Sequence, residues 1–155
     1  MDTDETNQSG WKWSIFTVRW VLGLIFFMAG WWKCFELSPM GHAERFFIER
    51  YEETWIPTWM LWATGTTIPV LELLAGLLVC LGLLRNAAYI TLAAILVTVT
   101  YGHLLTAPLY DTTSHIFPRL VLLVFLFVAP RQFDVLSLDH LIARWRGKGS
   151  DGNGA

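Results

Sequence analysis

The stretch that decides the fold is Ile68–Leu84, with the sequence IPVLELLAGLLVCLGLL. It is apolar almost throughout and, at 1.5 Å per residue, is long enough as a helix to cover most of a hydrocarbon core roughly 30 Å thick. It contains one carboxylate, Glu72. A charged side chain inside a lipid-spanning helix costs several kcal/mol unless it is paired or protonated. Glu72 is therefore the first candidate functional residue.

The composition supports a membrane location. The 155 residues are 54% hydrophobic, and the mean hydropathy is +0.45, which is high for a soluble domain. The length suits one domain, and a formal net charge of -2 gives no sign of nucleic-acid binding. There are two cysteines and no CxxC pair, so neither a zinc site nor a redox dithiol is predicted. The first residues are acidic and polar, so we expect no cleaved signal peptide.

Apolar stretches recur along the whole chain, and they predict an all-α integral membrane protein. We expect a four-transmembrane-helix bundle over residues 13–139, with an amphipathic surface helix in the first loop. A disordered polar tail is expected over residues 1–12, and a basic interfacial segment followed by a flexible tail over residues 140–155. The predicted spans are about 13–33, 58–84, 87–106 and 116–130, and the surface helix covers about 39–52.

Individual residues predict where helices start, bend and turn. Ser38 followed by Pro39 is typical of a helix start, since serine caps the helix and proline fits its first turn. Pro69 removes one backbone hydrogen bond in the middle of the second span. Arg85 and Asn86 form a short turn, so the second and third spans must be antiparallel. With four spans both termini lie on the same side of the membrane, and lysine and arginine placement favours the cytoplasm for that side.

Two stripes of small and polar residues run along the first two spans. Arg19, Gly23, Gly30 and Lys33 share one helical face. The glycines would let a neighbouring helix approach closely, while the charged ends would reach the two interfaces. On the second span Glu72 shares its face with Gly65, Gly76 and Cys80. At 1.5 Å per residue, a Glu72–Arg19 pair is feasible if the two helices adjoin.

A second, basic group is predicted at the opposite ends of the spans. Lys33, His103 and Arg119 lie there, with Glu36 and Glu44 of the first loop as candidate partners. These groups allow two interpretations. They are either interhelical ties that hold a small bundle together, or the polar groups of a pocket that binds an anionic or quinone-like ligand.

Several stretches resemble the DoxX family of small bacterial membrane proteins, which includes the DoxD-like group. They are Arg19–Phe26, Ala29-Gly30 with Lys33, Glu72–Arg85 and Ser137-Leu-Asp139. The resemblance implies a four-helix bundle in the bacterial cytoplasmic (inner) membrane, multi-pass, with both termini inside. It also implies quinone-linked oxidation, as in a subunit of thiosulfate:quinone oxidoreductase.

The residues themselves suggest which groups would act on such a ligand. We assign proton-handling, catalytic roles to Glu72 and to His103, because histidine ordinarily titrates near neutral pH. Ligand-binding roles fall to Arg19, Lys33, Thr100 and Arg119. No metal site is predicted, because His103 is the only histidine within a span and the cysteines are too few for a cluster. Cys34 and Cys80 are expected at different depths, too far apart for a disulfide.

Two functions remain open on the sequence alone. The first is a subunit of a quinone-linked membrane oxidoreductase, working with partner subunits in the lipid bilayer and holding quinone as a ligand rather than as a covalently bound cofactor. The second is a non-enzymatic membrane scaffold, assembly or lipid-binding protein. Transport of a small solute is less well supported, because four short spans offer little room without oligomerisation.

Overall fold

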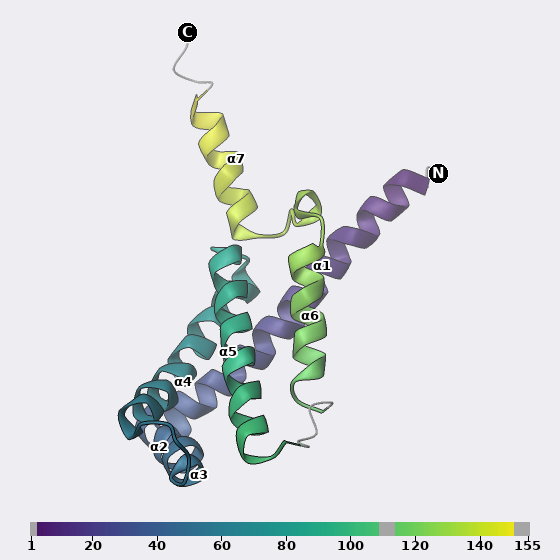
Figure 1. Ribbon diagram of the computed structural model, residues 1–155. Helices are drawn as coiled ribbons and strands as arrows, with labels where there is room; N and C mark the ends of the chain where they lie inside the picture. The colour runs from purple at the N-terminus through teal and green to yellow at the C-terminus, as the bar shows by residue number, and fades with distance from the viewer. Residues whose placement is uncertain (1–2, 109–113, 151–155) are drawn as a thin grey trace.

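The regular elements of the described residues, 3–108 and 114–150 of this computed structural model, are all helical (Figure 1). The elements are α1 (Thr3–Trp31), η1 (Trp32–Glu36), α2 (Pro39–Ala43), η2 (Glu44–Ile48), α3 (Glu49–Tyr51), α4 (Thr58–Leu81), α5 (Arg85–Thr106), α6 (Phe117–Val128), η3 (Arg131–Phe133) and α7 (Leu138–Ser150). The turns η1 and η2 are π-helical, and η3 is a 3-10 turn.

Three stretches are long and apolar enough to cross a membrane, namely Asn7–Glu36, Thr58–Leu81 and Arg85–Thr106. The chain is therefore a multi-pass integral membrane protein. The predicted count of four spanning helices is not confirmed, because α6 has 12 residues. Proline limits α6 at both ends, with Pro118 in its first turn and Pro130 just beyond its last residue.

The crossing of α1 and α4 depends on glycine. A Cβ on Gly23 would come within 2.5 Å of Cys80 Sγ. A Cβ on Gly30 would collide with the backbone of Leu73, and one on Gly76 with the backbone of Phe27. The expectation that Gly23 and Gly30 allow a close helix approach is confirmed. The contacts also fix the register of this antiparallel pair.

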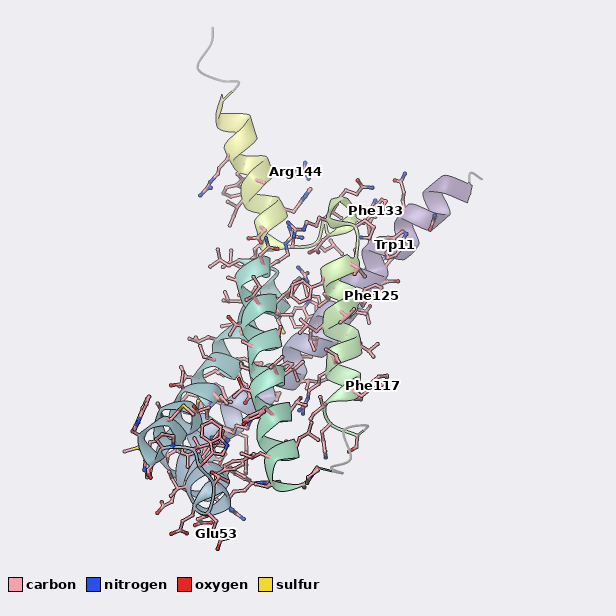
Figure 2. All side chains as sticks on the ribbon, in the orientation of Figure 1. Trp11, Glu53, Phe117, Phe125, Phe133 and Arg144 are labelled. Atoms are coloured by element: carbon pink, nitrogen blue, oxygen red, sulfur yellow. The ribbon has the colours of Figure 1, made fainter. Side chains whose placement is uncertain are left out.

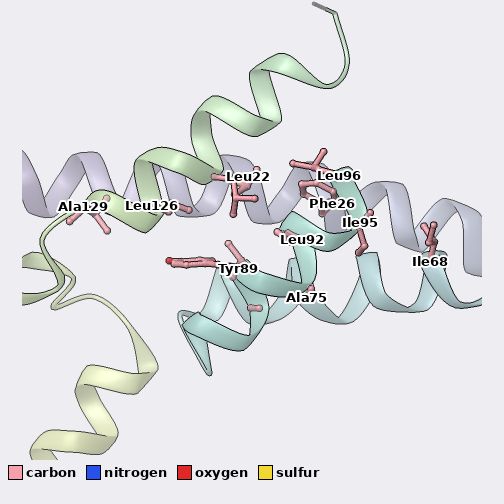
Figure 3. Close-up of a cluster of buried hydrophobic side chains, with 14 residues drawn as sticks. Leu22, Phe26, Ile68, Ala75, Tyr89, Leu92, Ile95, Leu96, Leu126 and Ala129 are labelled. Carbon is pink, nitrogen blue, oxygen red and sulfur yellow. The ribbon is translucent and has the colours of Figure 1, made fainter. Parts of the chain in front are cut away.

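The buried core lies between α1, α4, α5 and α6, as Figure 3 shows. Leu22 of α1 and Leu92 of α5 are completely buried, and Ala75 of α4 and Leu123 of α6 are nearly so. These side chains interlock in the middle of the bundle. Much of the outer surface is apolar as well, as expected for helices that face lipid.

Both ends of the chain are more helical than predicted. The helix α1 begins at Thr3 instead of about residue 13, so residues 3–12 of the expected disordered tail extend it, and residues 1–2 lie outside the described residues. Trp11 stacks on Phe125 and Phe133 at ring distances of 6.2 and 6.4 Å (Figure 2), which anchors this extension to α6 and η3. At the other end α7 continues to Ser150 and projects away from the bundle (Figure 1).

The first loop is helical without a break from Pro39 to Tyr51 through α2, η2 and α3, close to the helix predicted over about 39–52, with a π-helical turn in its middle. The start predicted at Ser38 is confirmed, since Ser38 Oγ accepts a hydrogen bond from the Gly41 N–H at 3.1 Å. This segment, the α2–α3 arm, packs on α4 at Gly65, where a Cβ would come within 2.8 Å of the Ala43 Cβ. Its last turn reaches α5 at Gly102. One face of the arm is therefore covered by protein.

Candidate functional site

A cavity of about 340 Å³ lies where the α2–α3 arm meets α4 and α5. This volume is at the lower end of the range of about 300–1,000 Å³ that is typical of small-molecule sites. Apolar side chains form most of the wall, and polar groups are few. The apolar lining is Trp32, Phe46, Phe47, Ile56, Met60, Leu61, Ile68 and Val99; the polar lining is Lys33, His42, Arg50, Tyr51, Thr64, Thr98, Tyr101 and His103.

The buried carboxylate is neutralised beside this cavity. Lys33 Nζ lies 2.5 Å from Glu72 Oε2, and the exposed fractions of the two side chains are 21% and 6%. Lys33 lines the cavity, whereas Glu72 lies behind it on α4. The pair ties the end of α1 to α4. It also fixes the position of one positive charge at the cavity wall.

A proline on α4 determines how His42 is held. Pro69 has no N–H, so the carbonyl of Gly65, four residues earlier, lacks its usual helical donor. His42 of α2 supplies the replacement, with Nδ1 2.7 Å from the Gly65 oxygen. A carbonyl oxygen only accepts hydrogen bonds, so Nδ1 carries the proton. Gly65 also has no Cβ to obstruct the approach of α2.

The environment of His42 favours the neutral ring. Phe46 and Phe47 lie beside it at ring distances of 5.3 and 5.6 Å. Burial lowers the pKa of His42, the charge of Lys33 lowers it further, and the bond to the Gly65 carbonyl opposes both effects. At neutral pH the ring is therefore uncharged, with its second nitrogen, Nε2, as an acceptor.

The arm and α5 contribute the remaining polar groups. Arg50 donates from Nε and Nη2 to Thr106 Oγ1 at 3.3 and 3.4 Å, and no carboxylate pairs with it within the described ranges. The Tyr51 hydroxyl lies against Gly102, where a Cβ would come within 2.6 Å of it. Burial raises the pKa of Tyr51, although the Arg50 charge opposes this, so Tyr51 remains a hydrogen-bond donor.

Two π-helical turns border this cavity. The turn η1 carries Lys33, and η2 carries Phe46 and Phe47. The π-helical geometry is rare and occurs frequently at functional sites, because it redirects side chains that a regular helix would space differently. Its presence on both sides of the same cavity supports a binding role for that region.

The opposite end of the bundle contains a separate charge network. Arg19, only 1% exposed, lies 3.4 Å from Asp134 Oδ1 and donates to the Leu136 carbonyl at 2.6 Å. Arg85 bridges Asp134 and Asp139 at 2.6 and 3.2 Å. Asp139 also accepts the backbone N–H groups of Leu84 and Arg85, which begin α5. These contacts join the segment after α6 to the α4–α5 turn.

The expected Glu72–Arg19 pair is wrong, and the glycine register explains why. Gly30 meets Leu73 and Gly23 meets Cys80, so Arg19 lies beside Gly82, where a Cβ would collide with its guanidinium. Glu72 is instead level with the end of α1. The separation along α1 between Arg19 and Lys33 is roughly 20 Å, beyond the reach of any side chain.

The remaining predicted site residues are dispersed. Of the six residues to which the sequence analysis assigned catalytic or ligand-binding roles, Lys33 and His103 line the cavity and Glu72 pairs with Lys33. Thr100 donates to the Leu96 carbonyl of its own helix at 2.6 Å. Arg119 lies over the Phe26 ring at 5.7 Å. Lys33 is therefore tied to α4 and not to the loop carboxylates proposed for it.

The two cysteines are unbridged. Cys80 packs at Gly23, whereas Cys34 lies in η1, roughly 16 Å further along α1. The expected separation in depth is confirmed. Among the described residues, no three histidine, cysteine or acidic side chains gather as metal ligands would.

The comparison with known families decides the classification. Residues 11–116 match the family described as "Methylamine utilisation protein MauE", which is more than half of the chain. The chain belongs to the MauE family. No curated protein and no solved structure matches it. The MauE match includes α1 from Trp11 onward, the arm, α4 and α5, and therefore the whole cavity lining.

The MauE assignment overturns the resemblance to DoxX, and with it the expectation of a thiosulfate:quinone oxidoreductase subunit. Three of the four stretches that carried the resemblance lie inside the MauE match. Their glycines and leucines serve the α1–α4 crossing, and any bundle with so close a crossing needs similar residues. The pattern is therefore specific for packing and not for one family.

Sequence reasoning missed His42 and Asp134. His42 lay outside the predicted spans, but the missing donor at Pro69 was a usable signal for a compensating side chain near Gly65. Asp134 could have been predicted from the balance of charges at one end of the bundle. Two arginines, Arg19 and Arg85, lie at one end of the bundle, and burying them requires a nearby carboxylate.

Proposed function

We propose that this MauE-family chain binds a lipophilic compound with an oxygen-bearing ring as its head, of which a quinone is the membrane-soluble example. The observation that carries the proposal is the cavity beneath the α2–α3 arm, with aromatic and aliphatic walls and a few hydrogen-bonding groups. A ring would pack against Phe46, Phe47 and Trp32. Its carbonyl oxygens would accept hydrogen bonds from Arg50 or Tyr51.

The location of the cavity favours a ligand that arrives through lipid. The cavity is bounded by α4 and α5, two of the helices able to span the membrane. Its lining includes Ile68, well inside α4, and Thr98, inside α5. A compound with an apolar tail could remain in the bilayer while its head occupies the cavity.

The charge of the cavity argues against methylamine itself as the ligand. The family is named for methylamine utilisation. Methylamine is a cation at neutral pH, as the lysine ammonium is. Lys33 and Arg50 line the cavity, no carboxylate is among its described lining residues, and Glu72 behind it is already engaged by Lys33. We therefore propose a supporting role in such a system, through a lipophilic ligand.

Partner oxidoreductase subunits, and the catalytic roles of Glu72 and His103, stay predictions.

We also propose that α6 and its flanking residues make a fourth crossing, with both termini on the cytoplasmic side of a bacterial inner membrane. The support is the contact of Asp139 with Leu84 and Arg85, because it returns the chain after α6 to the end of the α4–α5 turn. Fusion of a periplasm-dependent reporter after Ser150 tests this. An active reporter there would contradict it.

Ligand content is the first test of the main proposal. The protein is purified in mild detergent, extracted with organic solvent, and the extract is examined by a reduced-minus-oxidised ultraviolet spectrum. Binding of a short-chain decyl benzoquinone is then measured by equilibrium dialysis for the wild type and Arg50→Leu, with Arg144→Leu on α7 as the matched control. We expect saturable binding that falls on the order of tenfold only in Arg50→Leu. No saturable binding, with a tightly held lipid or protein instead, would favour the scaffold alternative.

A further inference from the structure

The hydrogen bond between His42 and the Gly65 carbonyl determines more than the position of α2. Because Pro69 cannot donate to that carbonyl, the carbonyl is reserved for His42 Nδ1. The proton on Nδ1 leaves Nε2 of the neutral ring with a lone pair. The two nitrogens of an imidazole ring point in diverging directions, so a ring that binds the Gly65 carbonyl through Nδ1 directs Nε2 away from that carbonyl, and His42 lines the cavity. The backbone of α4 thus fixes which hydrogen-bonding role the ring offers to a ligand.

We propose that His42 Nε2 is a hydrogen-bond acceptor of the cavity that cannot act as a donor while the ring is neutral, and that it makes the site prefer a ligand with a hydroxyl on its ring, a hydroquinone, over the same ring without one. The inference rests on the proposed function and deepens it by naming the form of the ligand. Lys33 and Arg50 of the cavity wall present only N–H donors, and the hydroxyls of its threonines and tyrosines can either donate or accept. Nε2 differs from them because it requires a proton from the ligand.

The groups around His42 support this role. Lys33 from η1, Arg50 and Tyr51 from α3 and His103 from α5 line the same cavity, and Glu72 of α4 is bound to Lys33. The charge of Lys33 disfavours a further positive charge on His42. The pKa of His42 is lowered, first by burial and then by Lys33, so acceptor capacity is present at neutral pH. On acidification the ring gains a proton at Nε2 and becomes a donor.

Three probes with one tail separate the alternatives. They are a decyl benzoquinone, its hydroquinone under anaerobic conditions, and the dimethyl ether of that hydroquinone, which keeps the ring and both oxygens but has no O–H. We expect wild-type protein to bind the hydroquinone about tenfold more tightly than the ether at neutral pH, the effect of one hydrogen bond to a buried acceptor. This preference should shrink as the pH falls below the usual histidine range.

The matched variant is His42→Asn. Asparagine places its amide nitrogen near the position of Nδ1, so it can still donate to Gly65, but it has no group where Nε2 lies. The preference for hydroquinone over ether should disappear in His42→Asn, while affinity for the quinone stays within about twofold. Pro69→Ala restores a helical N–H that competes with His42 for the Gly65 carbonyl. This variant should weaken the preference for hydroquinone over ether, although it changes none of the polar side chains that line the cavity.

The outcomes are distinguishable. Equal binding of hydroquinone and ether by the wild type, or a preference that survives His42→Asn, overturns the inference and leaves the proposed function standing. Failure of all three probes to bind overturns both. The tautomer of His42 can also be measured directly on the wild-type protein without any ligand. The ¹⁵N spectra of histidine-labelled protein report which ring nitrogen is protonated. A His42 ring protonated on Nε2 at neutral pH would also overturn the inference.

Discussion

Breaking the ion pair between Lys33 and Glu72 should have asymmetric effects. Glu72 is the more deeply buried partner, with 6% of its side chain exposed against 21% for Lys33. Lys33→Met leaves the carboxylate without a counter-charge, and orphaning a buried charge costs about 3–5 kcal/mol. Glu72→Gln leaves an ammonium on a flexible stem that can turn toward the interface, so about 1–2 kcal/mol is expected.

These free energies convert into measurable shifts. For a chain of this size, about 1 kcal/mol changes Tm by roughly 2–4 °C, so Lys33→Met should lower Tm by roughly 6–20 °C and Glu72→Gln by roughly 2–8 °C. The assay is thermal denaturation in mild detergent, followed by fluorescence-detected size exclusion. The double variant Lys33→Met/Glu72→Leu removes both charges and should recover to within about 1 kcal/mol of the wild type.

The refuting results are specific. If Glu72→Gln is the more damaging substitution, the burial argument fails. If the double variant loses the sum of the two single losses, the side chains do not interact and the pair is not formed in the membrane protein.

The other parts of the fold give three further predictions. Gly30→Val should destabilise the α1–α4 crossing by about 2–3 kcal/mol, because the new side chain collides with Leu73. The control Gly10→Ala has open space around it and should not destabilise the protein. The Tm values of the two variants in detergent test this difference. Asp134→Asn should cost about 3–5 kcal/mol because Arg19 loses its buried counter-charge, and an unchanged Tm would contradict the network. Asp139→Ala should cost about 1 kcal/mol at pH 7 through loss of the cap on α5.

The pH dependence of the Asp139 contribution has a definite sign. Burial raises the pKa of Asp139, but hydrogen bonds from the backbone of Arg85 and Leu84 and from the Arg85 guanidinium outweigh it and hold the pKa below its ordinary value. A carboxylate with a depressed pKa stabilises the fold above its ordinary pKa of about 4, and this contribution is lost as the pH falls further. The stability difference between wild type and Asp139→Ala should therefore be constant from pH 7 to 5 and shrink below about pH 4. A difference that grows on acidification would reverse the argument.

The fold could be predicted well where hydropathy and small residues specify it. The all-helical membrane class follows from the apolar stretches, and the α1–α4 crossing from Gly23 and Gly30. Hydropathy could not predict that α1 extends to Thr3. This extension depends on the stacking of Trp11 with Phe125 and Phe133, which lie more than a hundred residues away in the sequence.

The candidate site was harder to predict because side-chain pairing depends on helix register. Depth arithmetic placed Glu72 within reach of Arg19, but the glycine contacts set the two helices so that Lys33 meets Glu72 instead. The α2–α3 arm was expected on the membrane surface from its amphipathic pattern. The same pattern also fits a helix that packs on protein, and the contacts of Ala43 with Gly65 and of Tyr51 with Gly102 show that one face of the arm packs on α4 and α5. Its location at the membrane surface stays a prediction.

The family resemblance failed for a related reason. Glycine and leucine patterns report close helix packing, which unrelated bundles share, and therefore carry little information on reaction or ligand. The local features that do distinguish this chain are the π-helical turns and the bond between His42 and Gly65. Neither is visible in hydropathy.

The most direct test of the account is photolabelling of the wild-type protein in lipid nanodiscs with an azido-substituted benzoquinone, followed by mass spectrometry of the labelled peptides. A ligand site beneath the arm predicts saturable labelling within residues 42–51 or 98–103, where the α2–α3 arm and α5 line the cavity, and competition by unlabelled decyl benzoquinone. Labelling spread along the lipid-facing sides of α1 and α4, or labelling that no competitor reduces, would contradict a binding site beneath the arm.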